Sequence, residues 1–169
     1  MIKVEQILGI IILTCTTIIV LVLFLPLLDA GKADSISGFT VGFGGYYHYL
    51  NPHNVYFQWK IEFNTANMLA FIIPIIGGII AGFVCLIDAP LYAKFIGLLI
   101  GFSAFIVGFL LFRGVEGSTY YIDEISGLRG NLKLAGFKNA YGIYVAFVAL
   151  FGGALASLAD VVYVVSKEV

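Results

Sequence analysis

The sequence predicts a mainly α-helical membrane protein, built as a four-helix bundle with a small antiparallel sheet of three to four strands on one side. Composition is the first observation behind this prediction. Hydrophobic residues make up 61% of the 169 residues and charged residues only 11%, whereas a soluble domain carries about 25% charged residues. The second observation is that four long segments carry no charge, and the third is that two extended connections hold most of the polar residues.

The charge-free segments have the length of membrane spans. They run over 6–28, 63–87, 95–112 and 139–159 and contain 18 to 25 residues each. A membrane-spanning helix needs about 20 such residues, and lipid offers the backbone no hydrogen-bond partner, so each segment should be helical. We therefore expect a single integral membrane domain over 1–169, with spans at about 7–28, 67–87, 94–112 and 140–165.

Small residues recur at four-residue spacing in three of these spans. Such residues let helix backbones approach closely in a membrane, where apolar burial alone does not hold helices together. The pattern predicts a tight bundle, and the glycines expected at helix contacts are Gly78, Gly82, Gly97, Gly101, Gly108 and Gly153.

The first long connection, with a sheet region at 37–63, has the pattern of a three-stranded meander. Residues 55–63 alternate strictly between apolar and other side chains, the period of a strand with one apolar face. We expect turns at Gly44-Gly45 and at 51–54, which would place Leu50 opposite Val55, His48 opposite Phe57, and Tyr46 opposite Trp59. The second connection, 113–139, would add a strand near 118–122. The apolar face expected to contact a partner or lipid includes Phe39, Val41, Phe43, Tyr46, His48, Phe57 and Trp59.

Asp160 is the acid expected inside the membrane, near the end of the fourth span. An intramembrane acid is a functional candidate by default, although a structural Asp in a salt bridge is the simpler interpretation. It also lies at the negative end of its helix, so a cationic partner is expected. Lys3 and Lys94 lie on the same side of the predicted topology.

Other kinds of chemistry have no signal in the sequence. His48 and His53 do not converge in the predicted sheet, so no metal site and no cofactor are expected. Cys15 and Cys85 lie in apolar runs and are interpreted as free thiols. No nucleophilic or phosphate-binding pattern is present, so no catalytic residue is predicted. No basic cluster suggests nucleic acid as a partner.

The layout resembles the claudin-like tetraspan architecture. The first helix ends near Pro26, a strand-rich connection with Trp59 precedes the second helix, and a very short turn and a shorter second connection follow. The Gly-Leu-Trp and cysteine pair of claudins are missing, so the resemblance implies topology rather than junction sealing. The segment 37–44 and the glycine-rich second helix also resemble uncharacterised four-helix proteins of prokaryotes, a group that implies no activity.

Three functions are compatible with this layout. The first is a non-enzymatic membrane scaffold or assembly protein whose sheet contacts other copies of itself or a larger membrane complex. The alternative is an accessory subunit of a membrane enzyme, or a lipid- or quinone-binding protein. The third is a small transporter or channel component. In each case membrane lipids are partners, and the cell membrane is the expected location.

The orientation signals conflict. Six Lys and Arg residues lie in the long connections and three on the opposite side, which by the positive-inside rule puts the connections in the cytoplasm. Charge density in the short segments, and a tyrosine-rich sheet typical of an exported surface, favour the reverse. We expect the long connections outside the cytoplasm, with both termini inside.

Overall fold

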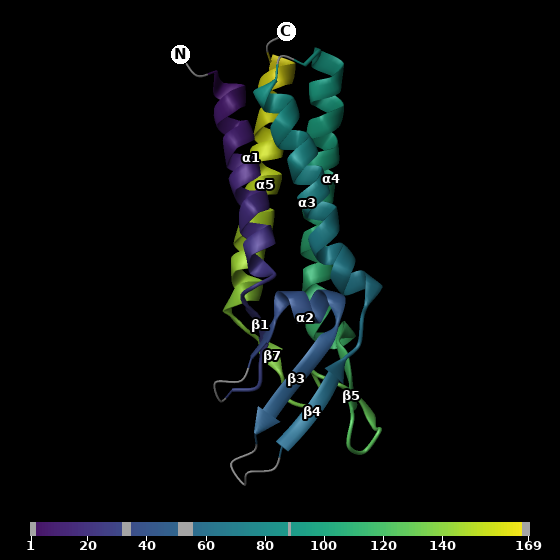
Figure 1. The fold of residues 1–169 in the computed structure, drawn as a ribbon. Coiled ribbons are helices and arrows are strands. Elements are labelled where there is room, and N and C mark those ends of the chain that lie inside the picture. Colours follow the sequence, from purple (N-terminus) through teal and green to yellow (C-terminus); the bar gives the residue numbers. More distant parts are fainter. Residues whose placement is uncertain (1–2, 32–34, 51–55, 88, 167–169) are drawn as a thin grey trace.

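Four long helices dominate the computed structural model, which describes residues 3–31, 35–50, 56–87 and 89–166. Both ends of the described chain lie at one end of the bundle, and the strands lie at the other (Figure 1). Each of the four is long and apolar enough to cross a membrane. They are α1 Val4–Val22, α3 Thr65–Leu86, α4 Leu91–Ser118 and α5 Tyr141–Ser166.

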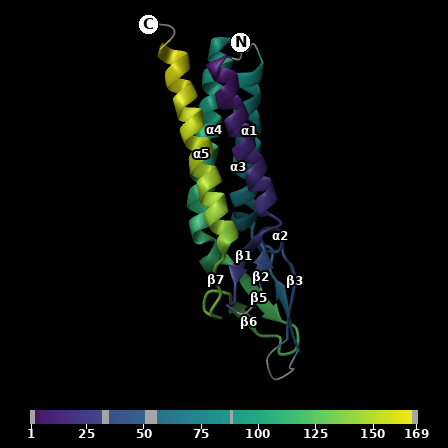
Figure 2. The ribbon, with the colours of Figure 1, turned by 90° about the vertical axis from the view of Figure 1, so that its left-hand side faces the viewer.

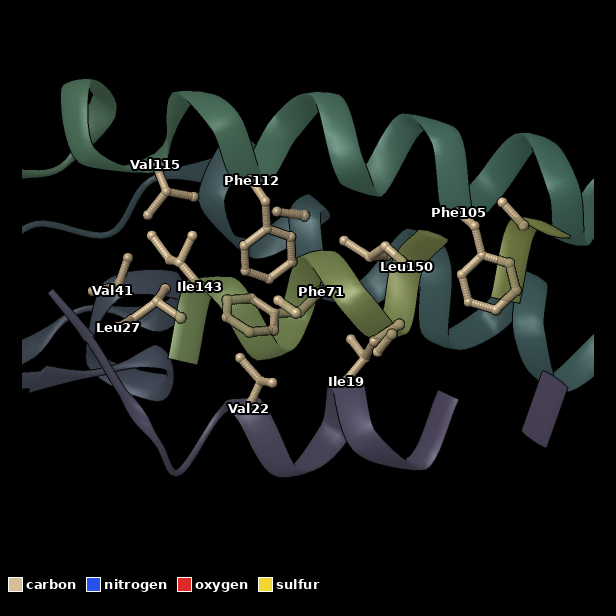
Figure 3. Close-up of a cluster of buried hydrophobic side chains, with 14 of the residues drawn as sticks. Ile19, Val22, Leu27, Val41, Phe71, Phe105, Phe112, Val115, Ile143 and Leu150 are labelled. Atoms are coloured by element: carbon tan, nitrogen blue, oxygen red, sulfur yellow. The ribbon is translucent and has the colours of Figure 1, made fainter. Parts of the chain in front are cut away.

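The helices form a closed bundle around an apolar interior. α1 packs against α3 and α5, and α4 packs against the same two helices, while α3 and α5 face each other across the diagonal and barely meet. Figure 2 shows the bundle turned by 90°. The interior is filled by large side chains that are fully buried (Figure 3), among them Ile19, Phe71, Phe105, Phe112 and Leu150.

Glycines lie wherever two helices come closest. A Cβ atom added to Gly153 would lie 2.5 Å from the Phe105 ring, and one added to Gly78 or Gly101 would overlap Thr16 or Ala81. The structure places the other three predicted packing glycines in the same situation: Gly82 against Leu13, Gly97 against Val84, and Gly108 against Pro74. Sequence spacing missed Gly9, which lies against Cys85.

The two long connections together build two small antiparallel sheets. One has the strand order β2-β1-β7 and the other the order β3-β4-β5-β6, so each contains strands from both connections. A short helix, α2 (Gly38–Phe43), separates β2 from β3. The strands are β1 Pro26–Asp29, β2 Ser35–Ser37, β3 Gly45–Leu50, β4 Tyr56–Ile61, β5 Tyr120–Asp123, β6 Arg129–Asn131 and β7 Lys138–Asn139.

The predicted first strand of the meander is wrong, because residues 38–43 form α2. The Ser37 hydroxyl caps this helix by accepting from the Thr40 N–H at 3.3 Å. Gly38 and Gly42 share one face of the helix and let it lie against the Phe71 ring. Gly44, at φ 80°, ends the helix. Gly44-Gly45 is therefore a helix end followed by a strand, and not a hairpin turn.

The predicted β3–β4 register is wrong by one residue. Tyr47 lies opposite Trp59 and His48 opposite Gln58. The expected turn at 51–54, and Val55 with it, lie outside the described residues. Because a shift of one residue moves a strand's side chains to the other face, Tyr46 and His48 lie on the face opposite Trp59.

The ends of two predicted spans also differ from the structure. α1 stops at Val22, and Pro26–Asp29 forms β1, in which Leu27 and Leu28 are fully buried. α4 continues to Ser118, past the charged Arg113. At the level of class, the chain is mainly helical with four long apolar helices and small antiparallel sheets, as the sequence predicts.

A buried amide ties the sheet end of the bundle together. The Asn67 side chain, 1% exposed, donates to Val41 O at 3.3 Å and to Thr119 Oγ1 at 3.0 Å. Its Oδ1 accepts from the Ser118 hydroxyl at 2.5 Å. These bonds join α2, α3 and the end of α4, so one side chain positions the elements from which the four-stranded sheet extends.

Replacing Asn67 by alanine is expected to destabilise the protein by about 2 kcal/mol, because buried hydrogen-bonding groups lose their partner. Denaturant unfolding of the full chain in mild detergent, followed by circular dichroism, measures this change. Gln58→Ala, which removes a partly exposed amide in β4, is the control and should change stability by less than about 0.5 kcal/mol. Equal effects of the two variants would contradict the assigned role of Asn67.

Candidate functional site

An aromatic cluster lies on the inner face of the four-stranded sheet. The Trp59 and Tyr121 rings stack with centroids 4.1 Å apart and an interplanar angle of 18°. The Tyr47 ring lies 6.1 Å from Trp59 and 5.6 Å from Phe137. Tyr47, Phe137 and the neighbouring Ile61 are all buried. Stacked and edge-to-face pairs at these distances add to the stability given by burial alone.

The inner face is covered by the chain's own second connection. Phe137 and Leu132 come from that connection and are buried, and Phe137 lies against both Tyr47 and Trp59. Trp59, predicted to contact a partner or lipid, is thus partly buried against the chain's own residues. Phe57, also predicted, lies opposite Tyr49 in the ladder.

The opposite face of the sheet is open, and we call it the outer sheet face. Tyr46 and His48 are exposed there, and their rings stack at a centroid distance of 6.5 Å. The Arg129 guanidinium lies 4.9 Å from the Tyr120 ring centroid, and its Nε donates to Glu62 Oε2 at 2.7 Å. The strand register places Tyr46, His48, Gln58, Lys60, Tyr120, Ile122, Arg129 and Asn131 on this face, and Glu62 joins it through Arg129.

The remaining predicted contact residues lie on α2, away from the sheet. Val41 is fully buried, whereas Phe39 is 51% exposed and stacks on Phe43 with centroids 5.1 Å apart. The seven predicted contact residues therefore do not form one surface. They divide between α2, the inner face and the outer face, and Tyr46 and His48 are the two that the outer sheet face contains.

Asp160 lies inside the bundle near the end that carries the termini. Its side chain is buried, and its Oδ2 is 2.9 Å from the Cys85 thiol, which can donate a hydrogen bond to it. The thiol also lies 3.0 Å from Ala81 O. Cys15 and Cys85 are both free cysteines. The structure thus pairs the predicted intramembrane acid with a thiol of α3.

An ion pair lies close to Asp160 and Cys85. Lys94 Nζ and Glu5 Oε2 are 2.6 Å apart, and the two side chains are only 14% and 10% exposed. Both are near enough to Cys85 to act on it electrostatically. Together Glu5, Cys85, Lys94 and Asp160 bring polar groups from all four long helices to one end of the bundle, and we call them the terminal polar cluster.

Glu5 was not predicted as a site residue, although the sequence contains a signal for it. The buried residues of α1 follow one stripe, Glu5, Gly9, Ile12, Thr16, Ile19 and Val22, at steps of three and four residues. Extending the stripe of apolar and small residues backwards by one turn reaches Glu5. A charged residue on the buried stripe of a helix apolar enough to span a membrane needs a partner, which Lys94 supplies.

The described residues give no sign of a metal site. Within 3–31, 35–50, 56–87 and 89–166, no three His, Cys, Asp or Glu side chains are placed to hold a metal ion. Comparison of the chain with protein-family models, with curated proteins and with solved structures found no match. The function must therefore be argued from the surfaces and the interior just described.

Proposed function

We propose that this protein is an integral membrane scaffold, a non-enzymatic protein of four spans that binds another membrane protein or a second copy of itself through the outer sheet face. That face is the observation behind the proposal. It is a regular sheet surface held beyond the end of the bundle, and it exposes Tyr46, His48, Tyr120 and Arg129. Tyrosine and arginine are enriched in protein interfaces and among the residues that dominate binding energy.

The bundle supports the proposal as an anchor. Its described interior is filled largely by apolar side chains such as Phe71, Phe105 and Phe112 (Figure 3). Such packing suits a rigid support better than a pathway for a polar solute. We further propose that the sheets lie outside the cytoplasm with both termini inside. The claudin-like architecture remains a prediction at the level of topology.

Photo-crosslinking in native membranes tests the proposed interface. A photoreactive amino acid at Tyr46 or Tyr120 should give crosslinked products with one defined protein partner or with a second copy. Leu134, 88% exposed in the second connection, is the matched control and should give few products. A strict monomer without products at Tyr46 and Tyr120, or equal yields at all three positions, would contradict the proposal.

Orientation has its own test. His48 is exposed on the outer sheet face, and both native cysteines lie in the bundle. In His48→Cys, a membrane-impermeant maleimide should therefore label position 48 in intact cells if the sheets lie outside. Labelling only after cell lysis would reverse the orientation while leaving the interface proposal intact.

A second candidate function, lipid binding, is favoured by a groove on the α3–α4 surface. The groove has a volume of about 480 Å³ and is lined almost entirely by apolar side chains, including Ile73, Ile96, Ile100 and Val107. In a bilayer such a groove suits an acyl chain. Mass spectrometry of the protein purified in mild detergent would support this function if one lipid remained bound at fixed stoichiometry.

A further inference from the structure

A small cavity lies beside the aromatic cluster of the inner sheet face. It has a volume of about 200 Å³ and is lined by Ala30, Tyr47, Trp59, Ala135 and Phe137. The two alanines are exposed, whereas Tyr47 and Phe137 are buried and Trp59 is partly buried. Exposed small residues and more deeply placed aromatic residues thus line the same cavity.

The three aromatic residues that line the cavity come from separate parts of the chain. Trp59 comes from β4, Tyr47 from β3, and Phe137 from the segment just before β7. Their centroids are 6.1 Å apart for Tyr47 and Trp59, 5.6 Å for Tyr47 and Phe137, and 6.1 Å for Trp59 and Phe137. These distances show that the rings also contact one another, and a group held in the cavity would lie beside all three residues. Ring faces attract a cation within about 6 Å of their centroids, and tryptophan attracts it most strongly.

An acid that would favour a cation lies close to one wall of the cavity. Asp123 lies opposite Trp59 in the β4–β5 ladder. The backbone N–H groups of Ser126 and Ile125 donate to its carboxylate at 3.2 and 2.9 Å and hold the pKa of Asp123 below its usual value. Asp123 therefore stays ionised at neutral pH. Lys138 follows Phe137 in the chain, and its partner in the β1–β7 ladder is the acid Asp29.

We propose that this cavity binds a quaternary ammonium group of the kind carried by choline, either as part of a lipid headgroup or in a soluble compound. A quaternary ammonium can contact aromatic side chains without needing acceptors, because it has no N–H groups. The size agrees, because drug-sized ligands occupy about 300–1,000 Å³ and the smaller cavity suits a single compact group. This site is separate from the outer sheet face and does not depend on the proposed scaffold function.

The only tryptophan of the chain reports on this cavity directly. Trp59 fluorescence of the full-length protein in maltoside detergent is measured during titration with tetramethylammonium chloride. Sodium chloride and 3,3-dimethylbutanol, an uncharged molecule with a similar branched end, are titrated in parallel. A saturable change with tetramethylammonium alone supports the proposal. No saturable change, or the same response to the uncharged molecule, overturns it.

Variants separate recognition of the cation from general packing. Tyr47→Leu should weaken tetramethylammonium binding about fivefold, the loss of one cation–π contact, while Tyr47→Phe keeps the ring and should restore most of the affinity. Tyr92→Leu, 71% exposed in α4 at the other end of the bundle, should leave binding unchanged. Ala135→Leu places a larger side chain in the cavity from an exposed lining position and should abolish binding. Unaltered binding in Tyr47→Leu and Ala135→Leu would place the cation elsewhere and overturn the proposal.

Two lipid environments then distinguish the sources of the cation. In nanodiscs of phosphatidylcholine, a headgroup already in the cavity should compete with tetramethylammonium and weaken its effect on Trp59. In nanodiscs of phosphatidylglycerol no such competition is expected. Weaker binding in phosphatidylcholine assigns the site to a lipid headgroup, and equal binding in both assigns it to a soluble quaternary ammonium compound.

Discussion

Leucine in place of Gly101 is expected to destabilise the bundle by about 3 kcal/mol, the upper part of the usual range for overpacking. Position 101 of α4 meets two other helices: a Cβ added there would overlap Ala81 of α3 and lie 3.4 Å from Ser157 Oγ of α5. Backbone also lies near, since Gly77 O would be 3.2 Å away. A leucine must therefore move α3 and α5 away from α4, because its neighbours are backbone and short side chains that cannot rotate out of the way.

The same helix supplies a matched control. A Cβ atom added to Gly114 has no neighbour within 4 Å, so Gly114→Leu introduces the same side chain into open space. Leucine favours helix over glycine by up to about 1 kcal/mol, so this variant should be as stable as the natural chain or slightly more stable. Detergent-solubilised variants are compared by thermal or denaturant unfolding. If Gly101→Leu were as stable as Gly114→Leu, helix packing through glycine would not determine this bundle.

Removing one partner of the Lys94–Glu5 pair should cost about 3 kcal/mol. In Lys94→Met, Glu5 keeps its charge in a site where its side chain is 10% exposed, and breaking a buried pair in this way is more costly than removing the whole pair. The double variant Glu5→Leu/Lys94→Met removes both charges and should recover most of the lost stability. Lys94 also lies in the first turn of α4, where the helix dipole disfavours a cation and Glu5 offsets it.

The double variant makes this prediction specific. Unfolding of both single variants and of the double variant completes a double-mutant cycle, which isolates the coupling between the two side chains. Lys60→Met, at an exposed position on the outer sheet face, controls for the loss of a lysine and should have little effect. Additive losses in the double variant would show that Lys94 and Glu5 act independently, contrary to the observed 2.6 Å separation.

The four helices could be predicted from the sequence because each segment repeats the same signal over many residues. The ends of the helices could not be predicted, because hydropathy indicates that a segment is buried but not whether its backbone is hydrogen-bonded as a helix or as a strand. Leu27 and Leu28 are as apolar as the helix before them, yet their strand pairs with β2 and β7. Pro26 marks the change of structure, but its place in the strand depends on partners far along the chain.

The sheet was harder to predict because its signals are ambiguous at the residue level. The alternation in β4 correctly places Trp59 and Ile61 on one face, but β3 carries tyrosines at 46, 47 and 49, so either face of β3 could match it. The pattern Phe39, Val41, Phe43 fits a strand, whereas Gly38 and Gly42 at helical spacing fit α2. These glycines contact Phe71 in the helical conformation. The local sequence pattern gives no information about that contact, because Phe71 lies in another helix.

The candidate sites were likewise predictable only where a local signal exists, and not where they depend on contacts between distant residues. Asp160 is visible in the sequence as an isolated acid in an apolar run, but Cys85 and Glu5 join it only through the packing of four helices. The outer sheet face depends on the β3–β4 register, and the register predicted from the sequence was wrong by one residue. The cavity beside Trp59 needs Phe137 from the second connection, and no spacing rule links residues so far apart.

The sharing of strands between the two connections has a consequence for how the chain is made. Trp59 can pair with Asp123 only after α3 and α4, which lie between these two residues in the sequence, have been synthesised and have packed side by side. Until then the β3–β4 hairpin has no cover for Tyr47 and Trp59, and a two-stranded hairpin alone is only marginally stable in water. Contacts between distant residues also form slowly, because a long loop must close first. A ribosome-bound chain that stops before residue 120, and so lacks β5, should therefore remain open to proteases at β3 and β4.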